Sequence, residues 1–206
     1  MDIIDFDSMY NEYTQNNNDF NICKEILNKL KIKDPVTYKH CYRVGCLACN
    51  FSMFLDYPKD FSMKIFNSAI IHDIGKIKVP DSIMNKAGGK LTPDEKKILS
   101  KHPFFGTEFI LENGYEQIYY ALPVIALHHE SAIDGKGIFK LNSSDLLNHI
   151  FLIKTCDCFD AIRIARRPDE TNKSLDETLY ILNNKCFHNL TKTWIEKFNS
   201  YIKHIL

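Results

Sequence analysis

The sequence predicts an all-α protein built as a helical bundle, and two observations lead to this prediction. Apolar residues recur at helical spacing along most of the chain, and no segment has the apolar–polar alternation of a half-buried strand. Histidines and aspartates also recur at intervals of about 26 to 32 residues, the length of one helix with its connection. A bundle with this repeat brings one polar side chain from each helix to a common layer.

The sequence divides into an N-terminal helical extension, residues 1–33, and a main domain, residues 34–206. Apolar residues at helical spacing predict a helix over 20–31. Pro35 suits the first turn of a second helix, which runs to about residue 55. A third helix is expected over 61–73.

After these helices comes a loop rich in Gly and Pro, residues 75–91. Thr92 is a good N-cap for the next helix, and Glu95 occupies the capping-box position. This helix is expected to reach about His102, where Pro103 limits or restarts it. Further helices are expected over 103–113, 115–130, 143–165, 174–184 and 191–205.

Composition excludes several classes of protein. The 206 residues include 26 basic and 26 acidic ones, and a formal net charge of zero argues against a protein that wraps long nucleic acid. No segment approaches about 18 uninterrupted apolar residues, so no membrane span is expected. The acidic start MDIIDFDSMYNEY lacks the basic and apolar regions of a signal peptide, which predicts a cytoplasmic protein.

The seven cysteines form no disulfide framework. Cys46 and Cys49 make a CxxC pair, but the pair lies within a helical pattern and no second pair stands at zinc-ribbon spacing. We interpret them as buried, reduced thiols rather than as a redox or metal site. Cys156 and Cys158, on either side of Asp157, have the same interpretation.

The recurring histidines and aspartates predict a metal site. A single histidine in a helix is usually an ordinary core or surface residue, and we assign that role to His149, His188 and His204. Three motifs at this helix-length spacing, the pair His72-Asp73, the single His102 and the pair His128-His129, are harder to attribute to chance. Imidazole and carboxylate groups suit iron, manganese, nickel, cobalt or zinc. The predicted members are His40, His72, Asp73, His102, His128, His129 and Asp157.

The adjacent pair His72-Asp73 favours two ions over one. Neighbouring residues on a helix point about 100° apart, so the aspartate can bridge two ions while the histidine binds one of them. Two ions about 3.5–4 Å apart activate water and neutralise an attacked phosphate. Lys76 follows within one helical turn and either holds a phosphate oxygen or interacts with the helix dipole. Spacing leaves both roles open.

Three motifs resemble the HD-GYP family, a branch of the HD phosphohydrolases. They are HDIGKIKVPDSIMNKAGGKLTPDEKKILSKHPFFG (72–106), HHESAIDGKG (128–137) and CDCFDA (156–161), within a similarity that spans about residues 35–170. The resemblance implies an all-α HD-domain bundle, and many family members hydrolyse c-di-GMP to linear pGpG or GMP. It also implies that the seven residues named above are metal ligands and that Lys76 contacts a substrate phosphate.

The sequence departs from the family pattern at the metal site and in the loop that faces the substrate. Trinuclear members carry a Glu where this chain has Val36, so the resemblance implies two metals. Ile138 and Phe139 replace the last two residues of the GYP triad, and Ser131 replaces an Arg. The changes in the loop affect contacts with a base or a partner and leave the seven predicted ligands in place.

Other residues are predicted to contact the substrate. Gly135 and Gly137 would let the loop backbone approach it closely. After CDCFDA the sequence IRIARRPDET has one residue more than the family pattern, and Arg163, Arg166 and Arg167 either contact phosphates or form a solvated helix end.

The predicted function is a metal-dependent phosphodiesterase that hydrolyses a cyclic dinucleotide through two divalent ions, iron or manganese, with nickel, cobalt or zinc as alternatives. Lys76 would neutralise a phosphate oxygen, and Asp73 or Asp157 would accept a proton from the water. Three alternatives stay open: a nucleotidase or phosphomonoesterase, a catalytically reduced nucleotide- or partner-binding domain, and a di-iron oxygenase. The expected partner is a small nucleotide, without long nucleic acid or membrane. A signalling protein or a homodimer remains open.

Overall fold

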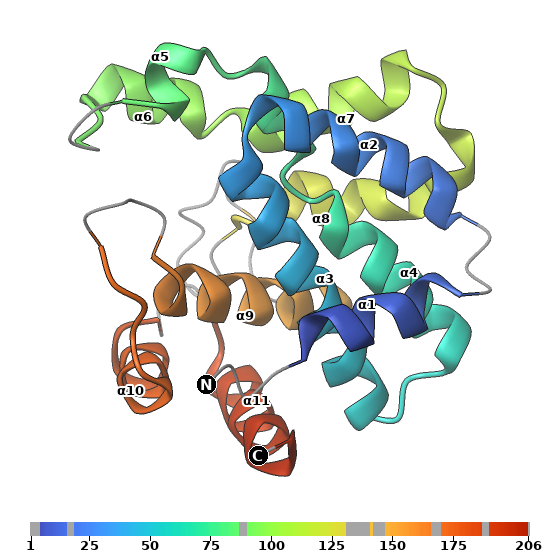
Figure 1. Cartoon of the computed structure of the whole chain (residues 1–206), viewed down its shortest axis with the longest axis vertical. Helices are drawn as coiled ribbons and strands as arrows, with labels where there is room; N and C mark the ends of the chain where they lie inside the picture. The colour runs from blue at the N-terminus through green and yellow to red at the C-terminus, as the bar shows by residue number, and fades with distance from the viewer. Residues whose placement is uncertain are drawn as a thin grey trace.

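A computed structural model describes residues 5–15, 19–86, 90–130, 141, 147–165, 170–186 and 190–205. Every regular element within these ranges is helical, which confirms the all-α prediction (Figure 1). The elements are α1 (Phe6–Thr14), α2 (Phe20–Lys33), α3 (Pro35–Phe54), α4 (Lys59–Ile70), the 3-10 helix η1 (Ile74–Lys78), α5 (Asp81–Met84), α6 (Pro93–Leu99), α7 (His102–Glu112), the 3-10 helix η2 (Glu116–Ala121), α8 (Leu122–Leu127), α9 (Asn148–Arg163), α10 (Leu175–Lys185) and α11 (Lys192–Ile205).

The antiparallel pair α3 and α4 forms the centre of the bundle. As the sequence predicted, α3 begins with Pro35 in its first turn, and the Asp34 carboxylate accepts a hydrogen bond from the backbone N–H of Val36. The two helices approach closely at Gly45, where a Cβ atom would lie 2.3 Å from the Ile70 side chain. A residue without a side chain is therefore needed at this crossing.

Apolar side chains pack on both sides of this pair. On one side α9, α10 and α11 close a cluster in which the Phe51 ring lies 5.2 Å from the Phe198 ring. On the other side α1, α2, α7 and η2 enclose a second cluster that includes Tyr13 and Leu27. Figure 1 shows α10 and α11 at the bottom of the view and α2 and α7 at the top right. The division into an extension and a main domain at residue 34 stays a prediction.

The cysteines behave as the sequence predicted. Cys46 and Cys49 are fully buried and free, and neither belongs to a group of side chains that could hold a metal within the described part of the chain. Burial raises the pKa of both thiols well above the usual range, so they stay protonated. The interpretation of this CxxC pair as buried thiols is confirmed.

The predicted helix over 61–73 is wrong at its end. α4 stops at Ile70, and His72 and Asp73 lie in a turn that leads into η1. The backbone N–H of Lys76 donates to the Asp73 carbonyl oxygen, which is the tighter 3-10 pattern. After this break the Gly75 backbone lies against α7. A Cβ atom at residue 75 would clash with the α7 backbone, so a larger residue would not allow this contact.

Other boundaries also differ from the prediction. The segment predicted as one helix over 115–130 is 3-10 helix η2 followed by α8, because Pro123 lacks an N–H and starts a new helix. The predicted loop contains η1 and α5. The capping box of Thr92 and Glu95 is present as predicted, although α6 ends at Leu99 and α7 begins at His102. In the described residues, no helix combines the length and the apolar character needed to cross a membrane.

We expect Gly75→Ala to destabilise the protein, because a Cβ there would lie 1.8 Å from the His102 carbonyl oxygen and 2.4 Å from the Gly106 nitrogen. Both contacts are to backbone, so the segments must separate, at a cost of about 1–3 kcal/mol or more. Urea unfolding measures this change. Gly114→Asn is the control, since Gly114 has φ +65 with no atom within 4 Å of its Cβ position, and asparagine tolerates that conformation. Equal stability of the two variants would contradict the expectation.

Candidate metal centre

The seven residues predicted as ligands come from five separate elements and meet in one place. His40 lies on α3, the pair His72-Asp73 in the turn after α4, and His102 at the start of α7. The remaining members are His128 and His129 at the end of α8 and Asp157 on α9. All are buried except His129, which is exposed.

The Asp73 carboxylate lies between two groups of ligands. Its Oδ1 atom is 3.0 Å from His102 Nε2 and 3.7 Å from His128 Nε2. Its Oδ2 atom faces the other way, 3.6 Å from His72 Nε2 and 4.0 Å from His40 Nε2. One carboxylate therefore contributes an oxygen to each side, which is the arrangement expected of a bridging ligand.

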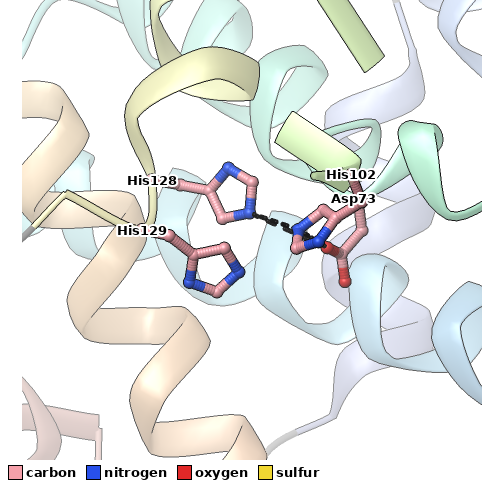
Figure 2. A group of neighbouring side chains, drawn as sticks. All are labelled: Asp73, His102, His128 and His129. Atoms are coloured by element: carbon pink, nitrogen blue, oxygen red, sulfur yellow. Dashed lines mark hydrogen bonds and ion pairs between the residues drawn. The ribbon is translucent and has the colours of Figure 1, made fainter. Parts of the chain in front are cut away.

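Each side forms a compact set of donor atoms. On the first side, one ligand atom from each of Asp73, His102, His128 and His129 lies within 4.8 Å of the others. Figure 2 shows these four side chains, with His102 Nε2 and His128 Nε2 3.2 Å apart. On the second side, His40, His72 and Asp157 meet the same limit, and His40 Nε2 is 2.9 Å from Asp157 Oδ1.

The backbone orients three of the histidine rings. In each case Nδ1 lies near the carbonyl oxygen three residues earlier. The distances are 2.7 Å for His72, 2.8 Å for His102 and 3.0 Å for His128. A carbonyl oxygen only accepts, so Nδ1 carries the proton and donates it. The Nε2 atom then keeps its lone pair and faces Asp73, as a metal ligand must.

The charges of the site suit a metal. Burial lowers the pKa of His72 to about 4 and lowers the pKa of His102, so both rings are neutral near pH 7. Burial alone would raise the pKa of Asp73, but the Lys76 ammonium and the neighbouring imidazoles hold it well below its usual range. Asp73 is therefore ionised beside the neutral imidazoles of His72 and His102. Burial would lower the pKa of His40, but its hydrogen bonds to Asp157 and Asp160 raise it.

The donor atoms fit a pair of transition-metal ions. His40 Nε2, His72 Nε2 and Asp73 Oδ1 are buried and have no hydrogen-bond partner of standard geometry among the described residues. A buried polar atom left without a partner costs about 1–3 kcal/mol. Three such atoms converge here, and their imidazole and carboxylate chemistry suits iron, manganese, cobalt, nickel or zinc.

A cavity of about 260 Å³ opens beside the centre. Lys76 lines it, with Nζ 2.5 Å from Asp73 Oδ2. Lys154 lines it as well, and its ammonium donates to the Glu130 carbonyl oxygen. The cavity is lined by Asp73, Lys76, His128, His129, Lys154, Asp157, Cys158 and Ala161.

Several residues near the centre were not found by sequence reasoning. Asp160 contacts His40 Nδ1 at 2.7 Å, and Arg43 donates to Asp160. Each lies three residues after a predicted ligand, on the same helix face, and this spacing was an available signal. Cys41 lies close to His72 and Asp73, but burial raises its thiol pKa well above the usual range, so it remains a protonated thiol.

Of the other predicted substrate contacts, Arg163 alone lies within the described residues. Arg163 ends α9 away from the cavity, and its guanidinium lies 3.5 Å from the Lys173 carbonyl oxygen. His149 and His204 lie outside the cluster, against Phe61 and Phe54, as expected of ordinary histidines. The remaining residues, Ser131, Gly135, Gly137, Ile138, Phe139, Arg166, Arg167 and His188, lie outside the described residues.

Comparison with known proteins identifies the family. Residues 23–188 match the HD domain family. The chain belongs to the HD domain family. The resemblance found in the sequence, to the HD-GYP branch, is therefore confirmed at the level of the HD domain.

Named proteins are similar to this chain over most of its length. A cyclic di-GMP phosphodiesterase of Thermotoga maritima is 35% identical over 155 residues, which are 74% of this chain and 41% of that protein. A 3'3'-cGAMP-specific phosphodiesterase 2 of Vibrio cholerae serotype O1 is 26% identical over 86% of this chain and 34% of its own length. The chain thus spans less than half the length of these relatives.

A solved structure has the same fold. The HD domain of the L. monocytogenes phosphodiesterase PgpH, in complex with cyclic-di-AMP, superposes with a TM-score of 0.64. It is 19% identical and covers 86% of this chain and 93% of its own. At this identity the likeness establishes a common fold.

We expect Asp73→Ala to reduce metal binding by both ligand groups, because one Asp73 oxygen faces each group. His129→Ala should weaken only the position that includes His102 and His128, because His129 belongs to that group alone. Elemental analysis of Mn²⁺-loaded, dialysed protein measures the metal content per chain. The same metal content in Asp73→Ala and in the unchanged protein would exclude a bridging role.

Proposed function

We propose that this HD domain is a metal-dependent phosphodiesterase that hydrolyses a cyclic dinucleotide. The observation that carries the proposal is the division of the Asp73 oxygens between two ligand groups beside a cavity. When bound, two ions in these positions would activate water and neutralise charge on the attacked phosphate.

The ligands would divide between the two positions. His102, His128 and His129 with Asp73 Oδ1 would hold one ion, and His40, His72 and Asp157 with Asp73 Oδ2 would hold the other. Iron or manganese is our first assignment, with nickel, cobalt or zinc as alternatives, because imidazole and carboxylate ligands suit all of them.

Side chains of the cavity would act on the substrate directly. Lys76 would turn its ammonium from Asp73 Oδ2 toward a non-bridging phosphate oxygen and neutralise its charge. Asp157 is better placed than Asp73 to accept a proton from the attacking water, because its side chain is 12% exposed against 2% for Asp73. Lys154 adds a second positive charge to the cavity wall.

The relatives support a cyclic dinucleotide as the substrate. Their names specify cyclic di-GMP and 3'3'-cGAMP, and the PgpH HD domain was solved with cyclic-di-AMP. The metal cavity alone is smaller than the roughly 300–1,000 Å³ of common ligand sites. A second hollow of about 430 Å³ shares Ala161 with it and includes Ile162, Ile164 and Ile181 in its lining. A substrate larger than a single phosphate ester therefore has room on this face.

The test is to incubate Mn- or Fe-loaded protein with c-di-GMP, 3'3'-cGAMP, c-di-AMP and a panel of mononucleotides, and to resolve the products. We expect a linear dinucleotide or a mononucleotide from at least one cyclic substrate, and none after metal removal or in Asp73→Ala. Release of phosphate from mononucleotides alone would favour a phosphomonoesterase. Binding without product would favour a binding domain.

We expect Lys76→Gln to lower kcat by about 10²–10³-fold while the metals stay bound, since it removes one cation that faces the reacting phosphate. Lys78→Gln is the matched control, because Lys78 lies on the same 3-10 helix but pairs with Glu108 and Glu112 at the surface. Steady-state kinetics with elemental analysis separates the two variants. Equal kcat values for both would remove Lys76 from the mechanism.

A further inference from the structure

We propose that Asp160 and Arg43 are positioning residues that orient His40 and so determine whether the metal position formed by His40, His72 and Asp157 is filled. This inference rests on the proposed dinuclear site.

His40 is oriented differently from three other histidines of the centre. The Nδ1 atoms of His72, His102 and His128 contact backbone carbonyls of their own preceding turns. His40 Nδ1 instead lies 2.7 Å from Asp160 Oδ2, a carboxylate carried by another helix. Both side chains are 3% exposed, so water does not compete for this contact.

Arg43 in turn fixes the Asp160 carboxylate. Its Nε donates to Oδ1 at 2.6 Å and its terminal nitrogen donates to Oδ2 at 2.9 Å, a bidentate contact with restricted geometry. Arg43 lies one turn after His40 on α3, and Asp160 lies one turn after Asp157 on α9. The predicted ligand His40 and the neighbouring Arg43 on α3 thus face a second pair on α9, Asp157 and Asp160.

The Asp160 carboxylate determines which nitrogen of His40 is available. Because Asp160 accepts from Nδ1–H, the Nε2 atom points toward Asp157 Oδ1, 2.9 Å away. A carboxylate partner of this kind fixes the ring and the tautomer of a metal-binding histidine. Without it, the His40 ring can rotate or place its proton on Nε2, and neither form presents the lone pair to an ion.

The effect should be confined to one of the two positions. The other position uses His102 and His128, whose Nδ1 contacts are to backbone and do not involve Asp160. Loss of Asp160 should therefore give a protein with one tightly bound ion. A role that is only structural, joining α3 to α9, would weaken both positions together with the fold.

The experiment is a Mn²⁺ titration of the unchanged protein and of Asp160→Ala, with elemental analysis and electron paramagnetic resonance. We expect the second Mn²⁺ to bind about 10–100-fold more weakly in Asp160→Ala. The spectrum at two equivalents should change from that of a coupled pair to that of an isolated ion. Asp160→Asn keeps an acceptor for Nδ1–H and should restore part of the affinity.

Val44→Ala is the matched control. Val44 is fully buried on α3, in the apolar cluster that also contains α9 residues. Its substitution by alanine should lower the unfolding temperature without loss of the second ion. Equal loss of that ion in Val44→Ala and Asp160→Ala would overturn the inference, as would two tightly bound ions in both Asp160 variants. Fewer than two ions in the unchanged protein would instead refute the dinuclear site itself.

Discussion

The rest of the centre depends on the buried carboxylate of Asp73. An ionised carboxylate removed from water costs several kcal/mol unless charges and hydrogen-bond donors surround it. Lys76 and imidazoles from α3, α7 and α8 provide that environment. The requirement explains why the chain breaks after α4, because the turn at His72-Asp73 places the carboxylate at the meeting point of these helices. It also explains why residue 75 is a glycine. Without a side chain there, α7 can approach closely enough to place His102 Nε2 3.0 Å from Asp73 Oδ1.

The two sides of the centre are fixed by different means. The side of His102 and His128 depends on backbone carbonyl oxygens three residues before each ring. The side of His40 depends on a contact between two helices that are distant in sequence, through the Asp160 carboxylate. A change in the packing of α3 on α9 would therefore act on His40 through Asp160. The two proposed metal positions would then differ in affinity, although Asp73 would belong to both.

Much of this arrangement could be predicted from the sequence. The interval between histidines indicated that several helices contribute to one layer, and Pro35 and the pair Thr92–Glu95 marked helix starts through local chemistry. The end of α4 was missed because the apolar pattern continues past Ile70, while the break depends on a backbone contact with α7. Asp160 was missed for a related reason. Its spacing from Asp157 was visible, but its partner His40 lies on another helix, and only the packing of α3 against α9 brings them together.

Substrate choice has to come from outside the metal layer. The relatives are named for different cyclic dinucleotides, yet a phosphodiester linkage is the same in all of them. The proposed ligands of two ions and the lysine proposed to face a phosphate oxygen would respond to that linkage and not to a base. In the described part of the chain, a hollow that shares Ala161 with the metal cavity has none of the predicted ligands in its lining. Its lining includes Ile162 in the last turn of α9 and Ile164 just after that helix, together with polar side chains such as Lys173. It therefore offers both apolar and polar contacts to a ligand. If this hollow contacts the bases, base preference and metal binding would change independently, because different residues line the two cavities.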